Sequence, residues 1–454
     1  MPAVTPPRKI VNVTGLPVCG SPIDSAWLNS KCTHRFVGPG EDAVCVDDAE
    51  CADAMKPGQK SATQHTPANK IRPRWCKAFI GCILPISQTL GNPFFSERVG
   101  GIEHVVYNKL MRALVKTSAQ PGLTATDRPD PKPGPSEAII RVTATSLCGT
   151  DAHIYNWDPW AHSRIHPPRI IGHEMCGEVV NVGSNVTLVK VGDYVAAESH
   201  LTCGHCFQCR TGQAHVCKDY RILGVDRDGS FAEYVVLPEA VLWKTSSTIP
   251  PELACLQEPL GNAVDAALVE DLTGQTVLIT GCGPTGLFAA AVARTAGAAM
   301  IIATDVSAYR PDLAKQVGVD HVFDAKIETM DRIAAAVREI TAGEGVDASL
   351  EMSGNPTAFH QAFSAVKNGG RVTLFGIPTG PMNCDLANEI IFKGIRVYGI
   401  TGRRLFKTWY RLTGLFQAGL NIKPVITHTF PMKDFARGFE LINSGQCGKV
   451  VLIP

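Results

Sequence analysis

The 454-residue sequence lacks the features that mark several broad classes of protein. Its formal net charge is +1, so no overall excess of positive charge attracts nucleic acid or an acidic membrane surface. It contains no apolar run as long as a membrane span, no recognisable cleavable signal peptide and no repeat of solenoid period. With 45% hydrophobic and 19% charged residues, we expect a cytoplasmic globular protein of two or more domains.

The first 110 residues also lack a sustained helix or strand period. Arg8 and Lys9 give a faint likeness to a transit peptide, but the amphipathic helix of one is missing. We therefore expect residues 1–110 to be a poorly ordered extension of unknown role, followed by a regular pattern from Met111. This part holds six scattered cysteines without metal-site spacing: Cys19, Cys32, Cys45, Cys51, Cys76 and Cys82.

The rest of the chain predicts two domains. Residues 111–261 contain short β segments and turns, which indicate a β-barrel-like domain. Residues 262–401 alternate strands with helices, which indicates a parallel, doubly wound sheet. Residues 402–454 end in a short apolar strand and are expected to return to the first domain. The predicted elements are strands at Ala138–Ala144, Gly177–Val182, Tyr194–Ala197, Thr276–Thr280, Met300–Thr304, Ala348–Glu351 and Arg371–Phe375, and a helix at Leu287–Ala296.

Four cysteines stand close together in the pattern C-x2-C-x2-C-x7-C: Cys203, Cys206, Cys209 and Cys217. Four thiolates at this spacing can form a closed tetrahedral shell around one zinc ion. A ferredoxin-type cluster needs an earlier fourth cysteine followed by proline, and here Lys218 follows. Disulfides suit a secreted domain, and nucleic-acid zinc fingers space their cysteine pairs further apart. The spacing favours structural zinc over these alternatives.

A glycine turn follows a predicted buried strand and opens a predicted helix. Gly281, Gly283 and Gly286 form G-x-G-x-x-G, whose backbone can approach a pyrophosphate at a helix N-terminus. Asp305 ends the next strand, where a carboxylate hydrogen-bonds the adenosine ribose and disfavours a 2′-phosphate. Arg310 is a nearby residue that could accommodate that phosphate. We give Asp305 the greater weight and predict NAD rather than NADP.

A second set of metal-binding residue types lies earlier in the chain. Cys148, His173 and Glu174 offer a thiolate, an imidazole and a carboxylate near strand ends. A catalytic zinc needs three protein ligands and one open position. Glu258 is a further candidate, either as a ligand or as a proton acceptor. Each residue alone has a structural alternative, because Cys148 could be a buried apolar side chain and Glu174 a surface charge.

These motifs together resemble the zinc-containing medium-chain dehydrogenase family, from Met111 to Pro454. The resemblance is carried by Gly172-His173-Glu174 with Gly177 and Gly183, by the four cysteines and by the glycine turn. Four segments resemble the branch of the family that oxidises L-threonine: CGTDAHIYNWDPW (148–160), EPLGNAV (258–264), EMSG (351–354) and GRRLFKTWY (402–410). The resemblance implies a GroES-like barrel, a Rossmann domain and a homotetramer.

The resemblance also implies roles for individual residues. It implies a catalytic zinc on Cys148, His173 and Glu174, and a structural zinc on the four cysteines. It places Thr150 and His153 in a proton relay, with Glu258 near the metal. His153 alone could equally be a structural histidine. The residues implied around NAD are Gly281, Gly283, Thr285, Gly286, Asp305, Arg310, Phe375, Gly376, Ile377, Ile400 and Thr401.

Two classes of function follow. The first is a dehydrogenase in which zinc lowers the pKa of a substrate hydroxyl and a hydride passes to NAD. L-Threonine is its expected substrate, with a polyol or another secondary alcohol such as butanediol as the alternative. The second class is a redox sensor or zinc-storage protein that has kept this fold. The full set of predicted catalytic and ligand residues favours the enzyme, because a sensor has no chemical need for all of them.

Overall fold

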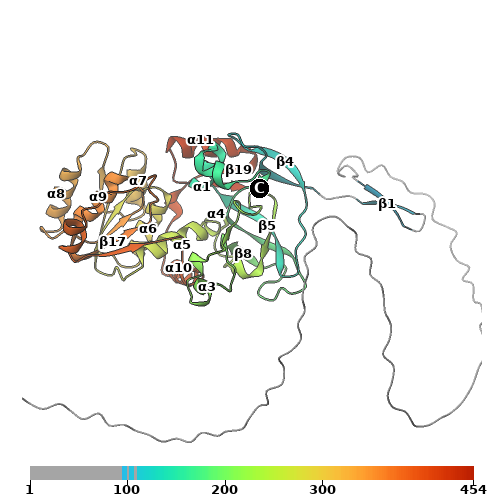
Figure 1. The fold of residues 1–454 in the computed structure, drawn as a ribbon, viewed down its shortest axis with the longest axis horizontal. Coiled ribbons are helices and arrows are strands. Elements are labelled where there is room, and N and C mark those ends of the chain that lie inside the picture. Colours follow the sequence, from blue (N-terminus) through green and yellow to red (C-terminus); the bar gives the residue numbers. More distant parts are fainter. Residues whose placement is uncertain (1–94, 100–101, 107–109) are drawn as a thin grey trace, which may run out of the picture. The chain divides into compact units, whose positions relative to one another are not determined.

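The computed structural model describes residues 95–99, 102–106 and 110–454 (Figure 1). The predicted poor order of residues 1–94 therefore lies outside the described residues. Strands β1 (Phe95–Val99) and β2 (Ile102–Val106) form an antiparallel ribbon. We had expected no regular element before Met111, so this ribbon is a difference from the sequence analysis. The next strand, β3, begins at Leu110.

A seven-stranded sheet forms the centre of the first part of the fold. Its longest strand, β5, is rich in β-branched residues and pairs antiparallel with β7 and β11. A smaller sheet of order β4-β3-β6 and a short β9–β10 pair complete this region. The seven strands are β5 (Glu137–Ser146), β7 (Glu174–Val182), β8 (Tyr194–Ala197), β11 (Tyr234–Pro238), β12 (Leu242–Lys244), β19 (Ile426–Pro431) and β20 (Lys449–Ile453). The smaller strands are β3 (Leu110–Lys116), β4 (Thr124–Pro129), β6 (Arg169–Ile170), β9 (His200–Leu201) and β10 (Arg221–Ile222).

The second sheet is parallel throughout and has the order β15-β14-β13-β16-β17-β18. The first strand in the sequence, β13, thus lies in the middle, and the order reverses between β13 and β16. This is the dinucleotide-binding arrangement, in which ligands bind beyond the carboxyl ends of the strands at the reversal. Its strands are β13 (Thr276–Thr280), β14 (Met300–Asp305), β15 (His321–Asp324), β16 (Val346–Glu351), β17 (Val366–Leu374) and β18 (Arg396–Gly399).

Helices cover both faces of this parallel sheet (Figure 1). On one face, α5 and α6 pack through Leu260 and Phe288 against Val277 of β13. On the other face, α8 and α9 pack through Val337 and Phe363 against the strand side chains that point to that face. The helices are α1 (Gly149–Asn156), α2 (Pro159–Arg164), α3 (Phe207–Arg210), α4 (Pro251–Ala254), α5 (Gln257–Ala267), α6 (Pro284–Thr295), α7 (Arg310–Gln316), α8 (Met330–Ile340), α9 (Pro356–Ala365), α10 (Lys407–Gln417) and α11 (Phe435–Ser444).

The end of the chain runs back into the first sheet. Strand β20 pairs antiparallel with β5, with Val451 opposite Ser146, and β19 pairs with β20. Helix α10 buries Trp409 and Leu412 in the same apolar cluster as α5 and β13. The boundary that we predicted between residues 261 and 262 falls inside α5, which is continuous from Gln257 to Ala267.

Several predicted elements differ from the observed ones at their ends. Helix α6 begins at Pro284, three residues before the predicted start, because the glycine turn leads directly into it. Strand β17 begins at Val366 rather than Arg371. Among the residues that the structure describes, no helix combines the length and apolar character needed to cross a membrane.

Candidate active site and metal centres

The four-cysteine loop brings its sulfur atoms together. The Sγ atoms of Cys203, Cys206, Cys209 and Cys217 all lie within 4.8 Å of one another. The Cys203 and Asp219 amides each donate to the Cys217 sulfur at 3.4 Å. Backbone amides lower the pKa of Cys206 to about 6, whereas burial and neighbouring sulfurs raise that of Cys209 to about 12. A four-thiolate set of this kind fits one tetrahedral zinc ion.

A second group of donors lies where β5 ends and β7 begins. The ligand atoms of Cys148, His173 and Glu174 also lie within 4.8 Å of one another. His173 and Glu174 are buried, and Cys148, at the N-cap of α1, is partly exposed. Glu174 Oε1 is a buried atom without a hydrogen-bond partner. A buried, unpartnered carboxylate oxygen beside a thiol and an imidazole fits a cation.

Asp151 provides a buried negative charge behind this group. One of its carboxylate oxygens accepts the Cys148 amide at 3.0 Å, and the other lies 3.5 Å from His173 Nδ1. Burial lowers the pKa of His173, but the charges of Asp151 and Cys148 outweigh burial and hold it well above its ordinary value. The donor set therefore favours positive charge, as a zinc site requires.

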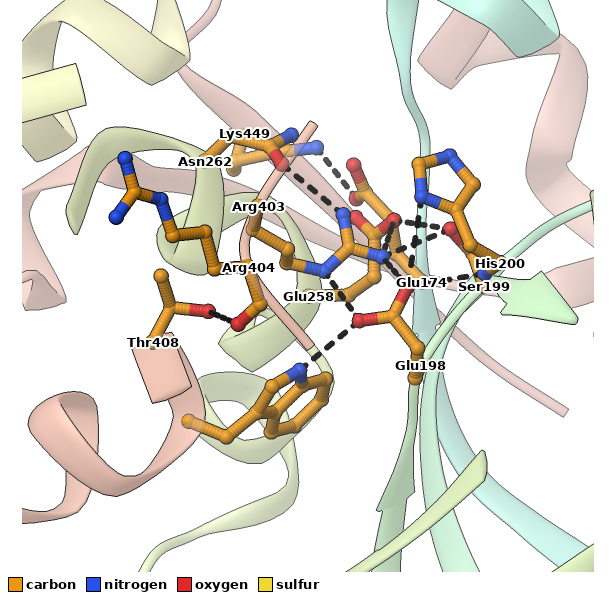
Figure 2. Close-up of polar contacts among 11 residues, drawn as sticks. Glu174, Glu198, Ser199, His200, Glu258, Asn262, Arg403, Arg404, Thr408 and Lys449 are labelled. Carbon is orange, nitrogen blue, oxygen red and sulfur yellow. Dashed lines mark hydrogen bonds and ion pairs between the residues drawn. The ribbon is translucent and has the colours of Figure 1, made fainter. Parts of the chain in front are cut away.

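Glu174 has a second cation beside it. The Lys449 ammonium, from β20, pairs with Glu174 Oε2 (Figure 2). It also donates to the Leu147 carbonyl at 3.0 Å. The Ser146 hydroxyl also bonds Oε2, so Oε1 is the oxygen left for a metal. Both Glu174 and Lys449 are almost fully buried. The return of the chain end to β5 is what brings this lysine to the site.

Glu258, near the start of α5, belongs to a buried charge cluster (Figure 2). The Arg403 guanidinium lies between Glu258, at 2.7 Å, and Glu198, with which it forms a two-point pair that includes a 2.8 Å bond. Ser199 donates to Glu258 at 2.5 Å, and the Trp409 indole donates to Glu198 at 3.0 Å. Burial works to raise the pKa of Glu258, but the Arg403 charge outweighs it and keeps the pKa below its ordinary value. Glu258 is therefore a carboxylate at neutral pH.

The two predicted relay residues lie on α1, the helix that follows the candidate metal ligand Cys148. Thr150 and His153 are both in α1, three residues apart, which places them on one side of the helix. His153 is exposed, with 59% of its side chain accessible, and its ring pairs with Asp158. The partly exposed candidate ligand Cys148 and a solvent-exposed imidazole thus lie on the same short segment.

The glycine turn lies at the reversal of strand order. A Cβ on Gly286 would lie 1.9 Å from the Gly281 carbonyl oxygen, whereas one on Gly283 would meet nothing within 4 Å. Glycine is therefore required at 286 to close the turn onto α6, and 283 is open for a ligand. Asp305 ends β14, accepts the Cys282 amide at 2.6 Å and lies 3.5 Å from Arg310. Arg310 Nε is buried without a hydrogen-bond partner, which fits an absent polar ligand.

The remaining predicted cofactor residues lie on nearby strand ends. Phe375 and Gly376 follow β17, and both amides donate to the Glu351 carbonyl at the end of β16. Ile377 is 88% exposed, and Ile400 and Thr401 follow β18. Thr285 lies in the first turn of α6.

Several residues of these sites were missed by the sequence analysis: Asp151, Glu198, Ser199, Glu351, Arg403 and Lys449. Each bonds a predicted site residue or a loop beside one. Arg403 stood in GRRLFKTWY, which was noted for its resemblance and not for its charge. Glu198 follows a buried strand, and a carboxylate at such a place is a usable signal for a paired site. In the sequence, Lys449 resembles an ordinary exposed lysine at the start of the last strand.

A parallel dinucleotide-type sheet beside two sets of zinc-type donors defines a zinc- and nicotinamide-dependent dehydrogenase. Residues 134–247 match the model for the alcohol dehydrogenase GroES-like domain, and residues 284–418 match that for zinc-binding dehydrogenases. The chain belongs to this family of zinc-containing medium-chain dehydrogenases, which confirms the resemblance and the predicted fold class.

Two relatives are similar to most of the chain. It is 52% identical over 345 residues to the L-threonine 3-dehydrogenase of Bacillus licheniformis, covering 76% of this chain and 99% of that protein. It is 49% identical over 346 residues to the enzyme of the same name from Symbiobacterium thermophilum, covering 76% of this chain and 98% of that protein.

Solved structures share the fold at lower identity. A Sinorhizobium meliloti protein bound to NADP has a TM-score of 0.70 and 27% identity, and covers 76% of this chain and 100% of its own. A short chain alcohol dehydrogenase from E. coli, in complex with NADH, has a TM-score of 0.69 and 26% identity, and covers 76% of this chain and 99% of its own. The 2R,3R-butanediol dehydrogenase of Bacillus subtilis has a TM-score of 0.68 and 28% identity, and covers 76% of this chain and 99% of its own. These neighbours include both nicotinamide cofactors, so they agree with a nicotinamide cofactor without distinguishing NAD from NADP.

Proposed function

We propose that the protein oxidises the β-hydroxyl of L-threonine to L-2-amino-3-ketobutyrate, with transfer of a hydride to NAD. The observation that carries this proposal is the 52% identity to an L-threonine 3-dehydrogenase over 99% of that enzyme's length. The clusters around Cys148 and Asp305 supply the metal and nucleotide chemistry that such a reaction needs.

The metal ligands proposed for catalysis are Cys148, His173 and Glu174. When bound, zinc supplies the positive charge that lowers the pKa of a hydroxyl in contact with it. Asp151 orients the His173 imidazole, and Lys449 engages one oxygen of Glu174. These residues hold the donor atoms in place before substrate arrives.

The substrate proton leaves by way of side chains of α1. Thr150 passes the proton to His153, which is exposed and can release it to water. Glu258, kept ionised by Arg403, holds negative charge near the reacting hydroxyl or the substrate amino group. A nicotinamide cofactor held at the glycine turn and Asp305 would supply the hydride acceptor.

We propose NAD as the preferred cofactor and two zinc ions per chain. Asp305 at the end of β14 offers two acceptor oxygens where the adenosine ribose binds in this fold and disfavours a 2′-phosphate. The residues proposed around the cofactor are those named from the sequence. The second zinc is proposed for the four thiolates, where a closed shell leaves no position for substrate.

A homotetramer and the predicted division of the chain are part of the proposal. Strand β18 is the last strand of its sheet, and Val397 on it is 38% exposed. Ile391 and Phe392, just before it, are 67% and 77% exposed. An edge strand beside exposed apolar residues suits pairing with a second copy. We retain the predicted roles of residues 111–261, 262–401 and 402–454, and a cytoplasmic location.

The test is NADH formation in a screen of L-threonine, D-threonine, sorbitol and 2,3-butanediol, each with NAD and with NADP. We expect the highest kcat/KM with L-threonine and NAD. A far higher value with another alcohol contradicts the substrate assignment, and equal values for both cofactors contradict the role of Asp305. The absence of turnover with every alcohol in zinc-replete protein favours a sensor.

The alternative is a secondary-alcohol or polyol dehydrogenase. Its support is the shared fold with the 2R,3R-butanediol dehydrogenase of Bacillus subtilis, at 28% identity. The threonine assignment has much higher identity behind it, so it is the primary proposal.

A further inference from the structure

Asp158 contacts the relay histidine in a way that the relay itself does not explain. Its Oδ2 lies 2.5 Å from His153 Nδ1, while its Oδ1 accepts the Ala161 amide at 2.9 Å. One carboxylate therefore bonds the histidine ring and caps the N-terminus of α2 at the same time.

The backbone fixes this carboxylate beside the ring. Trp157, the residue after α1, has a φ of +56°, and this left-handed turn folds the chain back on the helix. The Asp158 amide then donates to the His153 carbonyl at 3.3 Å. Both the main chain and the side chain of Asp158 thus bond the same residue, so the contact does not depend on one flexible side chain.

The charge of Asp158 decides which ring nitrogen carries the proton. Burial works to raise the pKa of Asp158, but hydrogen bonds from the Ala161 amide and His153 outweigh it and lower the pKa. A carboxylate has no proton to donate, so it requires a proton on the facing Nδ1. Nε2 is then the nitrogen left to accept a proton from Thr150.

We propose that Asp158 is a positioning residue that holds His153 in the tautomer whose Nε2 receives the substrate proton. The inference rests on the proposed function only in that the reaction must release a proton; it holds for any alcohol substrate. Oxidation of one alcohol by one nicotinamide yields the carbonyl compound, the reduced cofactor and one proton, and that proton crosses His153 to water.

Asp158→Asn tests the tautomer and keeps the helix cap. The side-chain amide oxygen of the variant must still face the Ala161 N–H, because a backbone N–H can only donate. The side-chain NH2 group of the variant therefore faces His153 Nδ1. Nδ1 becomes an acceptor and the ring proton moves to Nε2, where it blocks the relay. We expect kcat to fall about tenfold or more, with the KM for NAD and the zinc content unchanged. Added imidazole buffer should restore part of the lost turnover, because it provides another proton acceptor.

Asp158→Ser is the matched control, because serine is an equally good N-cap but leaves the ring free to take either tautomer. Its loss of kcat should be smaller than that of Asp158→Asn, with a similar melting temperature. In a His153→Gln background, Asp158→Asn should have no further effect.

Three results would overturn the inference. They are wild-type turnover in Asp158→Asn, equal losses in the Asn and Ser variants without imidazole rescue, and a loss in Asp158→Asn that persists in His153→Gln. Each variant is assayed with the best alcohol from the screen. A change of substrate in that screen therefore corrects the proposed function and leaves this test intact.

Discussion

Arg403 is the residue whose burial has the largest consequence for the site. Its guanidinium is 1% exposed and forms ion pairs with both Glu198 and Glu258, which come from different parts of the sequence (Figure 2). Removing one partner of a buried charge group leaves the others uncompensated, which is more costly than removing the whole group.

Arg403→Met should therefore lower the free energy of unfolding by about 3–5 kcal/mol and reduce kcat, because Glu258 loses its counter-charge. Trp409→Phe is the control, since it removes one hydrogen bond to Glu198 and should cost only about 1 kcal/mol. Urea denaturation and steady-state kinetics measure the two effects. Equal stability of both variants would contradict the buried cluster as a stabilising unit.

Lys116 is a buried lysine held by carbonyl groups rather than by a carboxylate. Its ammonium donates to the Gln120 and Gly122 carbonyls, at 2.5 and 3.1 Å, and lies 4.8 Å from the Trp157 ring centroid. Burial lowers its pKa to about 8. The folded protein thus keeps a charge at neutral pH in a place that disfavours it.

The pH dependence follows from the sign of this shift. Between about pH 8 and pH 10.5 the unfolded chain retains a proton that the folded protein has lost, so the contribution of Lys116 to stability rises with pH. The melting temperature of the wild type should therefore rise relative to that of Lys116→Met across this window. A difference between the two proteins that stays constant with pH would show that Lys116 does not titrate there.

At the scale of elements, two glycines of the turn between β13 and α6 should affect different properties: Gly286 the stability of the fold, and Gly283 cofactor binding. Gly286→Ala places a methyl group 1.9 Å from the Gly281 carbonyl, so it should lower the melting temperature of the protein without cofactor. Gly283→Ala has free space, so its stability should match the wild type while its KM for NAD rises, because the methyl occupies the pyrophosphate approach. Thermal melting and cofactor titration distinguish the two. Equal melting temperatures for the two variants would argue against the close packing at 286.

The two sets of metal-binding residues should also affect different properties, the four cysteines folding and the set around Cys148 turnover. Cys206→Ser removes a ligand from a closed four-thiolate shell and should lower the melting temperature, whereas Cys148→Ser should spare folding and abolish turnover. Metal analysis should give two zinc ions per wild-type chain, with the ion at Cys148 exchanging faster in a chelator. One zinc ion or none in freshly purified, active protein would contradict this prediction.

At the scale of the whole molecule, the two sheets share one apolar core. Ala144 of β5, Leu260 of α5 and Val277 of β13 belong to the same buried cluster as Trp409 of α10. The chain end contributes both packing, through β19 and β20, and the Lys449 charge. Residues 110–454 therefore contain every residue named above for catalysis and metal binding.

A chain beginning at Met111 should accordingly retain the specific activity and melting temperature of the full chain. β3 loses only Leu110, its first residue, and the packing of Met111, Ala113 and Val115 is kept. Comparison of the two purified proteins is the measurement. A shortened protein that is soluble but inactive would show that the first 110 residues have a role in the site.

The sequence by itself determined the features that depend on local spacing. The four-cysteine loop lies within 15 consecutive residues, and the glycine turn, β13 and Asp305 lie in one strand–helix–strand unit, so their proximity follows from short-range geometry. Family membership followed from the same motifs.

Only the tertiary structure decided which charges meet in the interior. Arg403 and Glu198 are separated by 205 residues, and Lys449 and Glu174 by 275, so no local pattern links either pair. Each pair forms because a distant segment returns to the first sheet, and burial then requires every charge there to have a partner. The Asp158–His153 contact depends on the left-handed turn at Trp157, a conformation that the residue type does not indicate.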